Sequence, residues 1–315
     1  GGLCVCVNVF QMIEPVDVFW KCNKGYLATV HSLPNGDILI ANMGDPAGNG
    51  KGGDAIGERG RAGFSPNGPS AASALATGRA LPSPAPPYSS AVSRPILASR
   101  CRGCACPERS GEGLVSVGVY GRRLNFWNLS CHTLSQCFDL GEDSLPLNVR
   151  FLHNPDAAEG YVSCALSGVT YRFCKCEASC WEVEEVIRIP PINVCGWIMP
   201  KMPAFTTDII ISMDDRFLYL SNWLHGDIRQ YELSKTCKPR LVGQVFVGGL
   251  LTRCGSVSVC RDEELKCQPE PLVVKCKRVY GGPCKMQLSL DGKRLYVTNS
   301  LYSTWDKEFY PCVVR

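Results

Sequence analysis

The sequence has no apolar run approaching the ~18 consecutive residues that a membrane-spanning helix requires, so we predict no transmembrane segment. Its opening residues, Gly1 to Cys4, show no charged stretch followed by a long apolar one, so we expect no signal peptide. An excess of one charge is also missing, because 33 Lys and Arg against 29 Asp and Glu leave a net charge of +4. This balance does not favour nucleic acid or an anionic membrane surface as a partner.

Several catalytic and binding motifs are missing as well. No Gly-x-Ser-x-Gly sequence is present, so a hydrolase with that nucleophile has no support. The glycine-rich run 44–53 lacks the Lys-Ser/Thr ending of a phosphate-binding loop, because Lys51 is followed by Gly52. Basic residues are not interleaved with aromatic ones, as nucleic-acid-binding modules require. We therefore predict no nucleotide site and no nucleic-acid partner.

Cysteine, by contrast, is abundant, with 20 residues in 315. This share of about 6% is below the ~8–10% of small disulfide-rich scaffolds. Without a signal peptide, it favours a reduced, cytoplasmic chain over a disulfide framework. The tightest cluster, Cys101, Cys104 and Cys106, lacks the second cysteine pair or the spaced histidines of a structural zinc site. We therefore do not expect a metal there.

Three segments of the chain are copies of one another. Each has a serine, a polar turn and a short strand that ends in a small residue and Asn; the copies are Ser32–Asn42, Ser212–Asn222 and Ser289–Asn299. A second type of strand begins with glycine, alternates polar and apolar residues and ends on aromatic ones; it occurs at 121–129, 168–173 and 226–233. Turn residues followed by β-prone residues predict hairpins that enter buried strands.

Repeated turn-strand units with almost no helical periodicity predict an all-β fold, and specifically a β-propeller. At ~40–45 residues per blade, a chain of this length has room for about seven blades. A pair of β-sandwiches is the alternative, which the repetition disfavours.

One stretch, from Phe64 to Gly113, departs from this pattern. It is dominated by Ala, Pro, Ser, Gly and Arg, and it cannot bury enough apolar surface to offset the entropy lost on ordering. We predict a disordered low-complexity insert there, which is either flexible or mis-spliced. The predicted organisation is therefore N-terminal propeller blades at 1–63, the insert at 64–113 and further blades at 114–315.

Only four histidines are present, which makes their positions informative. His31 precedes the first repeat, His153 lies in a predicted turn, and His225 follows the second repeat. The ends of inner propeller strands converge on the central axis, so these three histidines could meet there and bind a transition metal. The alternative is that each is hydrogen-bonded in its own loop. The acidic residues at 214–215 and 262–264 are expected in solvated turns or charged loops.

Longer strings carry a resemblance to a known family. The chain closely resembles the selenium-binding protein family at FLHNPDAA (151–158), DDRFLYLSNWLHGD (214–227), QPEPLVV (268–274), QLSLDGKRLY (287–296) and WDKEFYP (305–311). The resemblance runs almost continuously from about 114 to 315, and a weaker one covers about 27 to 53.

The resemblance implies a cytosolic β-propeller that acts as a methanethiol oxidase, with copper as the metal, as in bacterial relatives. The implied reaction converts methanethiol, dioxygen and water into formaldehyde, hydrogen sulfide and hydrogen peroxide. A soft thiolate on a copper ion held by imidazoles suits this chemistry, since the metal can pass electrons to dioxygen. On this interpretation His31, His153 and His225 are metal ligands, and Asp156 and Asp227 orient the histidine rings.

The resemblance also implies selenium as a bound element, a small thiol and dioxygen as substrates, and a location in the cytoplasm and the nucleus. Peripheral membrane association and a protein partner are further expectations. The family's His- and Cys-rich N-terminal motif and its histidine-bearing C-terminal tail are missing, so we interpret the chain as a truncated or aberrantly spliced member. Cys174 and Cys176 stand where the family usually has other residues. The alternative function is a non-catalytic selenium-binding or protein-interaction propeller linked to intracellular protein transport.

Overall fold

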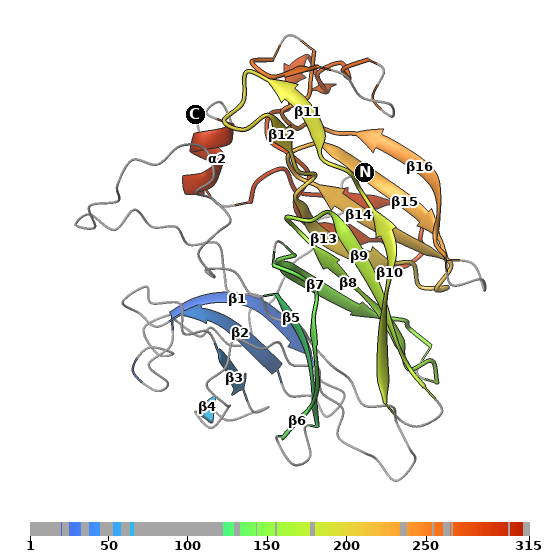
Figure 1. Ribbon diagram of the computed structural model, residues 1–315. Helices are drawn as coiled ribbons and strands as arrows, with labels where there is room; N and C mark the ends of the chain where they lie inside the picture. The colour runs from blue at the N-terminus through green and yellow to red at the C-terminus, as the bar shows by residue number, and fades with distance from the viewer. Residues whose placement is uncertain are drawn as a thin grey trace.

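The computed structural model consists mainly of antiparallel strands (Figure 1). It describes Trp20 and residues 25–32, 38–44, 53–57, 64–65, 122–128, 133–142, 144–154, 156–176, 180–233, 238–253, 255–260, 265, 267–301 and 303–310.

Three of the sheets have four antiparallel strands, each in sequential order. They are β1 (Gly25–Ser32), β2 (Ile38–Gly44), β3 (Gly53–Gly57) and β4 (Phe64–Ser65); β7 (Pro146–Phe151), β8 (Glu159–Cys164), β9 (Val169–Lys175) and β10 (Trp181–Arg188); and β13 (Thr206–Ile211), β14 (Phe217–Asn222), β15 (Asp227–Glu232) and β16 (Arg240–Phe246). Four sequential antiparallel strands are the arrangement of a propeller blade.

Smaller sheets and one helix complete the described elements. They are β5 (Arg123–Asn128) with β6 (Thr133–Asp139); β11 (Ile192–Cys195) between β12 (Lys201–Met202) and β17 (Ser258–Val259); β18 (Val273–Val274) with β19 (Lys277–Arg278); β20 (Met286–Leu288) with β21 (Leu295–Val297); and the helix α2 (Ser303–Phe309).

The turn between the first two strands of a blade is built in the same way in two of the predicted repeats. The Ser212 hydroxyl donates to Asp214 Oδ1 at 2.5 Å and accepts from the backbone N–H five residues further on at 2.9 Å. The Ser289 hydroxyl donates to Asp291 Oδ1 at 2.5 Å and accepts from the equivalent N–H at 3.0 Å. In both turns the hydrogen bond from serine lowers the pKa of the aspartate. These two repeats are therefore hairpins with a common turn, as predicted, whereas residues 33–37, the turn of the first copy, lie outside the described residues.

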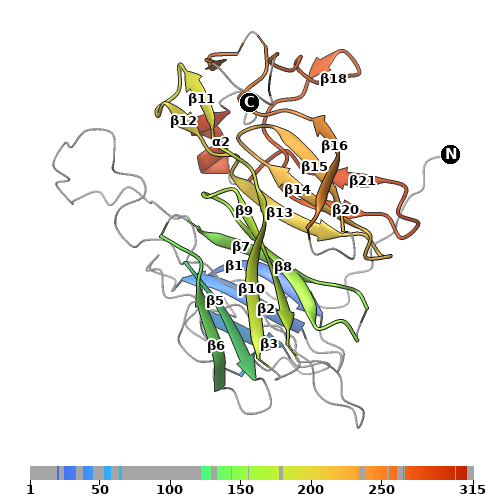
Figure 2. The ribbon, with the colours of Figure 1, turned by 45° about the vertical axis from the view of Figure 1, so that its right-hand side comes forward.

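Neighbouring blades pack face to face, which explains three consecutive isoleucines in β13. Side chains alternate along a strand, so Ile209 and Ile211 enter a core shared with β8 and β10, whereas Ile210 enters a core shared with β20. Figure 2 shows β20 and β21 beside this sheet. Both faces of β13 are buried, and a strand buried on both faces is apolar at successive positions.

An aromatic core joins β5 and β6 to the sheet that follows them. Phe126 of β5 stacks on Trp181 of β10, with ring centroids 4.5 Å apart, and Phe173 of β9 meets both rings edge-on. The backbone N–H of Trp181 also donates to Gln136 Oε1 of β6 at 2.6 Å. The strands of 122–139 therefore belong to the same succession of packed sheets.

The predicted all-β propeller is confirmed, with face-to-face blades in place of a sandwich. The first strands of three successive sheets, β7, β13 and β20, lie side by side, with β13 in the middle. Of the predicted insert, Phe64 and Ser65 form β4 and pair with β3, while 66–113 lie outside the described residues. Among the helices of the described residues, none is long and apolar enough to cross a membrane.

Candidate functional site

A buried imidazole lies in the turn between β14 and β15, Trp223–Gly226, which we call the His225 turn. His225 is 1% exposed, and its Nε2 lies 3.1 Å from the carbonyl oxygen of Met202. Because a carbonyl oxygen can only accept a hydrogen bond, Nε2 carries the proton, and Nδ1 carries the lone pair of the neutral ring. A metal ion bound by this imidazole would therefore have to use Nδ1.

Segments from other parts of the chain enclose the His225 turn. The Tyr310 hydroxyl donates to the Trp223 carbonyl at 2.6 Å, and the Leu250 N–H donates to the Leu224 carbonyl at 3.0 Å. The rings of Trp223 and Tyr310 meet edge-on, with centroids 5.1 Å apart, inside a core that also contains Met202. The imidazole is therefore set in rigid, mostly apolar surroundings.

His153 lies in the turn between β7 and β8 and contacts the neighbouring blade. Its ring Nδ1 is 2.8 Å from Asp215 Oδ1, and its backbone N–H donates to the same oxygen at 2.8 Å. The N–H of Asn154 donates to the other carboxylate oxygen at 2.8 Å. Asp215 therefore holds the whole turn and fixes Nδ1 as the protonated nitrogen of this exposed ring.

The structure does not bring His153 and His225 together. Asp215, which holds His153, precedes β14, whereas His225 follows it. The strand has six residues, so its ends are about 17 Å apart at ~3.4 Å per residue. One metal ion binds imidazole nitrogens at ~2 Å and cannot reach both. His31 is the second-last residue of β1, opposite Leu39 in the register, and its side chain is outside the described part of the structure.

Of the two carboxylates predicted to orient histidine rings, Asp227 has other partners. Asp227 is fully buried, and its Oδ2 accepts from Arg229 Nε at 2.8 Å and from Gln244 Nε2 at 2.6 Å, so it joins β15 to β16. Asp156 is exposed; the hydrogen bond that places it is made by its backbone N–H, which donates to Asn154 Oδ1 at 3.1 Å, and not by its carboxylate. The carboxylate that orients a histidine is Asp215, which the sequence alone had placed in a solvated turn.

A buried charged group that sequence reasoning missed lies where three first strands meet. Asp208 of β13 is 1% exposed, and its Oδ1 lies 3.6 Å from Arg150 Nη2 of β7 and 3.9 Å from Lys285 Nζ beside β20. Its Oδ2 accepts from the Met286 N–H of β20 at 2.9 Å. We call Arg150, Asp208 and Lys285 the inner-strand cluster. The available signal was an acidic residue directly before the three consecutive isoleucines 209–211.

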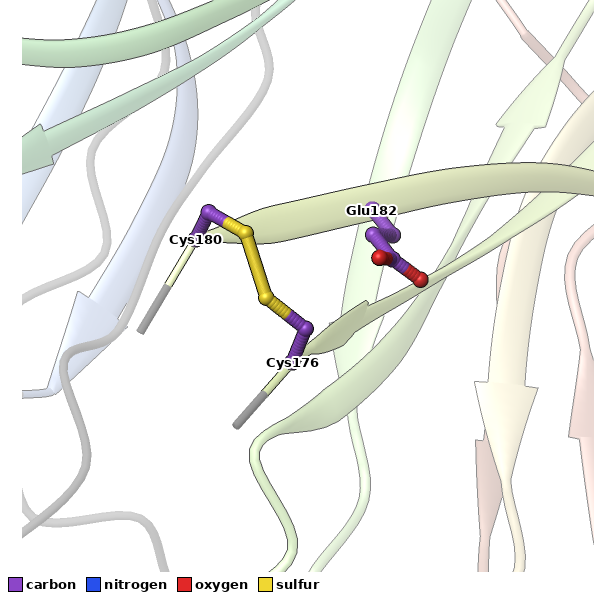
Figure 3. A group of neighbouring side chains, drawn as sticks. All are labelled: Cys176, Cys180 and Glu182. Atoms are coloured by element: carbon purple, nitrogen blue, oxygen red, sulfur yellow. A yellow bond between two sulfur atoms is a disulfide. The ribbon is translucent and has the colours of Figure 1, made fainter. Parts of the chain in front are cut away.

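The described cysteines include two disulfides, Cys176–Cys180 (Figure 3) and Cys195–Cys260. The expectation of a wholly reduced chain is therefore wrong at these two pairs. The first disulfide closes the tip of a hairpin, and the second joins two cysteines that are 65 residues apart. The number of cysteines in the sequence does not show which of them pair. The predicted cluster Cys101, Cys104 and Cys106 lies outside the described residues.

Two thiols, those of Cys164 and Cys284, are buried among apolar side chains and are expected to resist alkylation. Burial raises the pKa of Cys164 to about 12 and that of Cys284 to about 11. At a pH near the ordinary thiol value of about 8.5, both stay protonated, and the thiolate is the reactive form. We expect iodoacetamide to modify the exposed Cys137, Cys267 and Cys276 in the native protein. Peptide mass spectrometry should find Cys164 and Cys284 alkylated only after unfolding, and rapid native alkylation of either would contradict their burial.

The chain is similar to a family of selenium-binding proteins. Residues 105–315 match the family described as 56kDa selenium binding protein. A methanethiol oxidase of Xenopus tropicalis is 47% identical over 98% of this chain and 64% of its own length. The methanethiol oxidase of Homo sapiens is also 47% identical, again over 98% of this chain and 64% of its own length. The chain therefore spans just under two thirds of the length of these relatives.

A solved structure shows the likeness in three dimensions. The X-ray structure of a hypothetical selenium-binding protein from Sulfolobus tokodaii matches this chain with a TM-score of 0.70 at 28% identity. The match covers 96% of this chain and 64% of that one. Because it extends over nearly all of this chain, the succession of blades is common to both proteins.

Proposed function

The chain belongs to the 56kDa selenium binding protein family, and from this premise we propose that it oxidises methanethiol with dioxygen. In the proposed reaction, methanethiol, dioxygen and water give formaldehyde, hydrogen sulfide and hydrogen peroxide. The bond between carbon and sulfur breaks, the carbon is oxidised, and dioxygen takes up two electrons and two protons. The observation that carries this proposal is the 47% identity to methanethiol oxidases over nearly the whole chain.

We propose His225 as the described residue that acts on the thiol. Its imidazole is buried beside the apolar cluster of Trp223 and Met202, which suits a small apolar substrate. The Met202 carbonyl keeps the proton on Nε2, so Nδ1 is the nitrogen that can accept the thiol proton. Enclosure by rigid segments keeps the ring in one orientation and limits the access of water.

Copper, the metal that the resemblance implies, does not fit the predicted three-histidine set in this arrangement. His153 and His225 are separated by the length of β14, so a single ion cannot bind both. A copper ion bound through His225 Nδ1 would need its other ligands from elsewhere in the chain. We therefore assign no step of the reaction to copper.

The proposed activity is tested with purified protein and methanethiol in aerated buffer. We expect dioxygen uptake, with formaldehyde, sulfide and peroxide released in equal amounts. His225→Gln should lower the rate by about 100-fold, within the usual range for a lost acid-base residue. Glutamine keeps an N–H for the Met202 carbonyl, so this variant should fold. The exposed Glu142→Gln serves as the matched control and should keep the parental rate.

The separation of the two histidines gives this experiment a second outcome. His153→Gln should keep a larger part of the rate than His225→Gln, because the two rings lie at opposite ends of β14. Equal loss in both variants would contradict separate sites. Folded protein without dioxygen uptake would contradict the oxidase and support the alternative, a non-catalytic selenium-binding or protein-interaction propeller linked to intracellular transport.

Further properties of the family are extended to this chain as proposals. We propose selenium as a bound element, for which the family description is the support. Among the described thiols, the exposed Cys137, Cys267 and Cys276 suit it better than the buried ones. A cytoplasmic and nuclear location, peripheral membrane association and a protein partner have the same origin and are proposed on the resemblance alone.

A further inference from the structure

The tip of the β9–β10 hairpin carries three cysteines and a glutamate on one face. In the register of these strands, Cys174 lies opposite Glu182, and the Cys176 N–H donates to the Cys180 carbonyl at 2.8 Å. Side chains alternate along each strand, so Cys174 and Cys176 share a face with Cys180 and Glu182. We call these four residues the hairpin-tip cluster.

Three ligand atoms of the hairpin-tip cluster lie close enough together to bind one metal ion once the disulfide between two of them is opened. The sulfur atoms of Cys176 and Cys180 and a carboxylate oxygen of Glu182 all lie within 4.8 Å of one another (Figure 3). A tetrahedral zinc ion with Zn–S bonds of ~2.3 Å and Zn–O bonds of ~2.1 Å holds its ligand atoms within that range, with two sulfur ligands farther apart than the bonded sulfurs of a disulfide. The Cys174 sulfur lies outside this group of atoms, but Cys174 is directly opposite Glu182, and rotation of its side chain would bring the sulfur to the ion as a fourth ligand.

The charges around the hairpin-tip cluster favour a cation. Cys174 is opposite Glu159 of β8 on one side and Glu182 of β10 on the other. The nearest arginine, Arg172, donates to Glu159 at 2.6 and 2.8 Å and to Glu184 at 2.9 Å. Its positive charge is therefore balanced by those two carboxylates, while the Glu182 carboxylate remains beside the sulfur atoms.

We propose that the hairpin-tip cluster binds one Zn²⁺ ion when the Cys176–Cys180 disulfide is reduced. A dithiol reductant supplies two electrons and two protons; the S–S bond breaks, two S–H bonds form, and the reductant becomes a disulfide. Zn²⁺ then binds three sulfur atoms and one carboxylate oxygen, and the three thiol protons pass to solvent. Oxidation forms the disulfide again and releases the ion, so zinc binding at this hairpin depends on redox state.

This site is distinct from the His225 turn. The cluster belongs to the sheet β7–β10, on its last two strands, whereas His225 lies between two strands of the sheet β13–β16. Its test therefore does not depend on turnover of methanethiol. Loss of one property without the other separates this proposal from the proposed oxidase.

The site is tested by titrating the full chain with Zn²⁺ after reduction with dithiothreitol and removal of the reductant without air. We expect the parent protein to bind one equivalent more than Cys176→Ser/Cys180→Ser. Co²⁺ used as a probe should give a thiolate charge-transfer band in the parent that this double variant lacks. Cys137→Ser removes an exposed thiol elsewhere and should change neither result. Equal Zn²⁺ binding in the parent and the double variant would overturn the proposal.

Two single substitutions test the ligands without removing the disulfide. Glu182→Gln should weaken Zn²⁺ binding by at least about tenfold, the scale on which even indirect partners of a metal act. Cys174→Ser should lower the Co²⁺ charge-transfer band by the share of one thiolate in three. Unchanged affinity in Glu182→Gln, or an unchanged band in Cys174→Ser, would overturn the four-ligand site. Parent protein that is oxidised with diamide should no longer bind the additional equivalent of Zn²⁺. If the oxidised protein still binds it, the redox dependence would be overturned.

Discussion

Replacement of Asp208 by alanine is expected to lower the free energy of unfolding by about 3 kcal/mol, mostly through a lost hydrogen bond to the backbone. The Asp208 carboxylate accepts from the Met286 N–H at 2.9 Å, and an unsatisfied buried N–H costs about 1–3 kcal/mol. The ion pairs contribute less, because the Arg150 and Lys285 side chains are 35% and 55% exposed. Pairs with such solvated partners are worth about 0–1 kcal/mol each.

Asp208→Asn separates these two contributions. Asparagine keeps an oxygen that can accept from the Met286 N–H and loses only the charge, so we expect a loss of about 1 kcal/mol. Urea unfolding followed by tryptophan fluorescence measures both variants. If Asn and Ala cost the same, the charge would be the dominant interaction, and the assignment to the backbone hydrogen bond would be wrong.

The blades could be predicted from the sequence because their signals are local. The serine turns at Ser212 and Ser289 are specified within six residues, where one hydroxyl bonds both a carboxylate and a backbone N–H. The three isoleucines of β13 follow from the two buried faces of an inner strand. Both signals lie within short segments of the sequence, so the fold class can be predicted without knowing which distant residues are in contact.

The candidate metal site was harder to predict, because it depends on which end of a strand a turn occupies. His153 lies between the first and second strands of its blade, and His225 lies between the second and third. In an antiparallel blade, consecutive turns alternate between opposite ends, so these two positions diverge. Counting the strands that precede each turn would have shown that His153 and His225 are far apart. Their positions next to the repeats in the sequence do not show it.

Contacts between blades were beyond the reach of sequence patterns. The partners of Asp208 lie on β7 and beside β20, far away along the chain, and nothing in their spacing identifies them. The hairpin-tip cluster is an intermediate case. Its Cys-x-Cys-x₃-Cys spacing was visible at 174–180, and period-two alternation across a hairpin would have placed the three sulfurs on one face.

Replacement of Gly226 by alanine should lower the free energy of unfolding by more than about 4 kcal/mol and abolish the proposed activity. The reason is that this glycine allows three backbone segments to pack closely. Its φ of +86° is in the left-handed region. An alanine Cβ would overlap the carbonyl oxygen of Gly248 and lie 2.6 Å from Gly249 Cα. These atoms cannot retreat easily, because Val247 N–H donates to the Gly226 carbonyl at 2.8 Å and Gly249 N–H donates to the Gly281 carbonyl at 2.8 Å.

Gly141→Ala is the matched control for the backbone conformation. Gly141 has a similar φ of +97°, but a Cβ there would meet nothing within 4 Å. Its cost is therefore the left-handed conformation alone, about 1–2 kcal/mol. The additional loss of unfolding free energy at Gly226 measures how closely the segments that enclose His225 approach one another. A loss of this size needs a specific mechanism, which here is steric overlap. Equal unfolding free energies for the two variants would show that the His225 turn yields to an added methyl group and is not rigid.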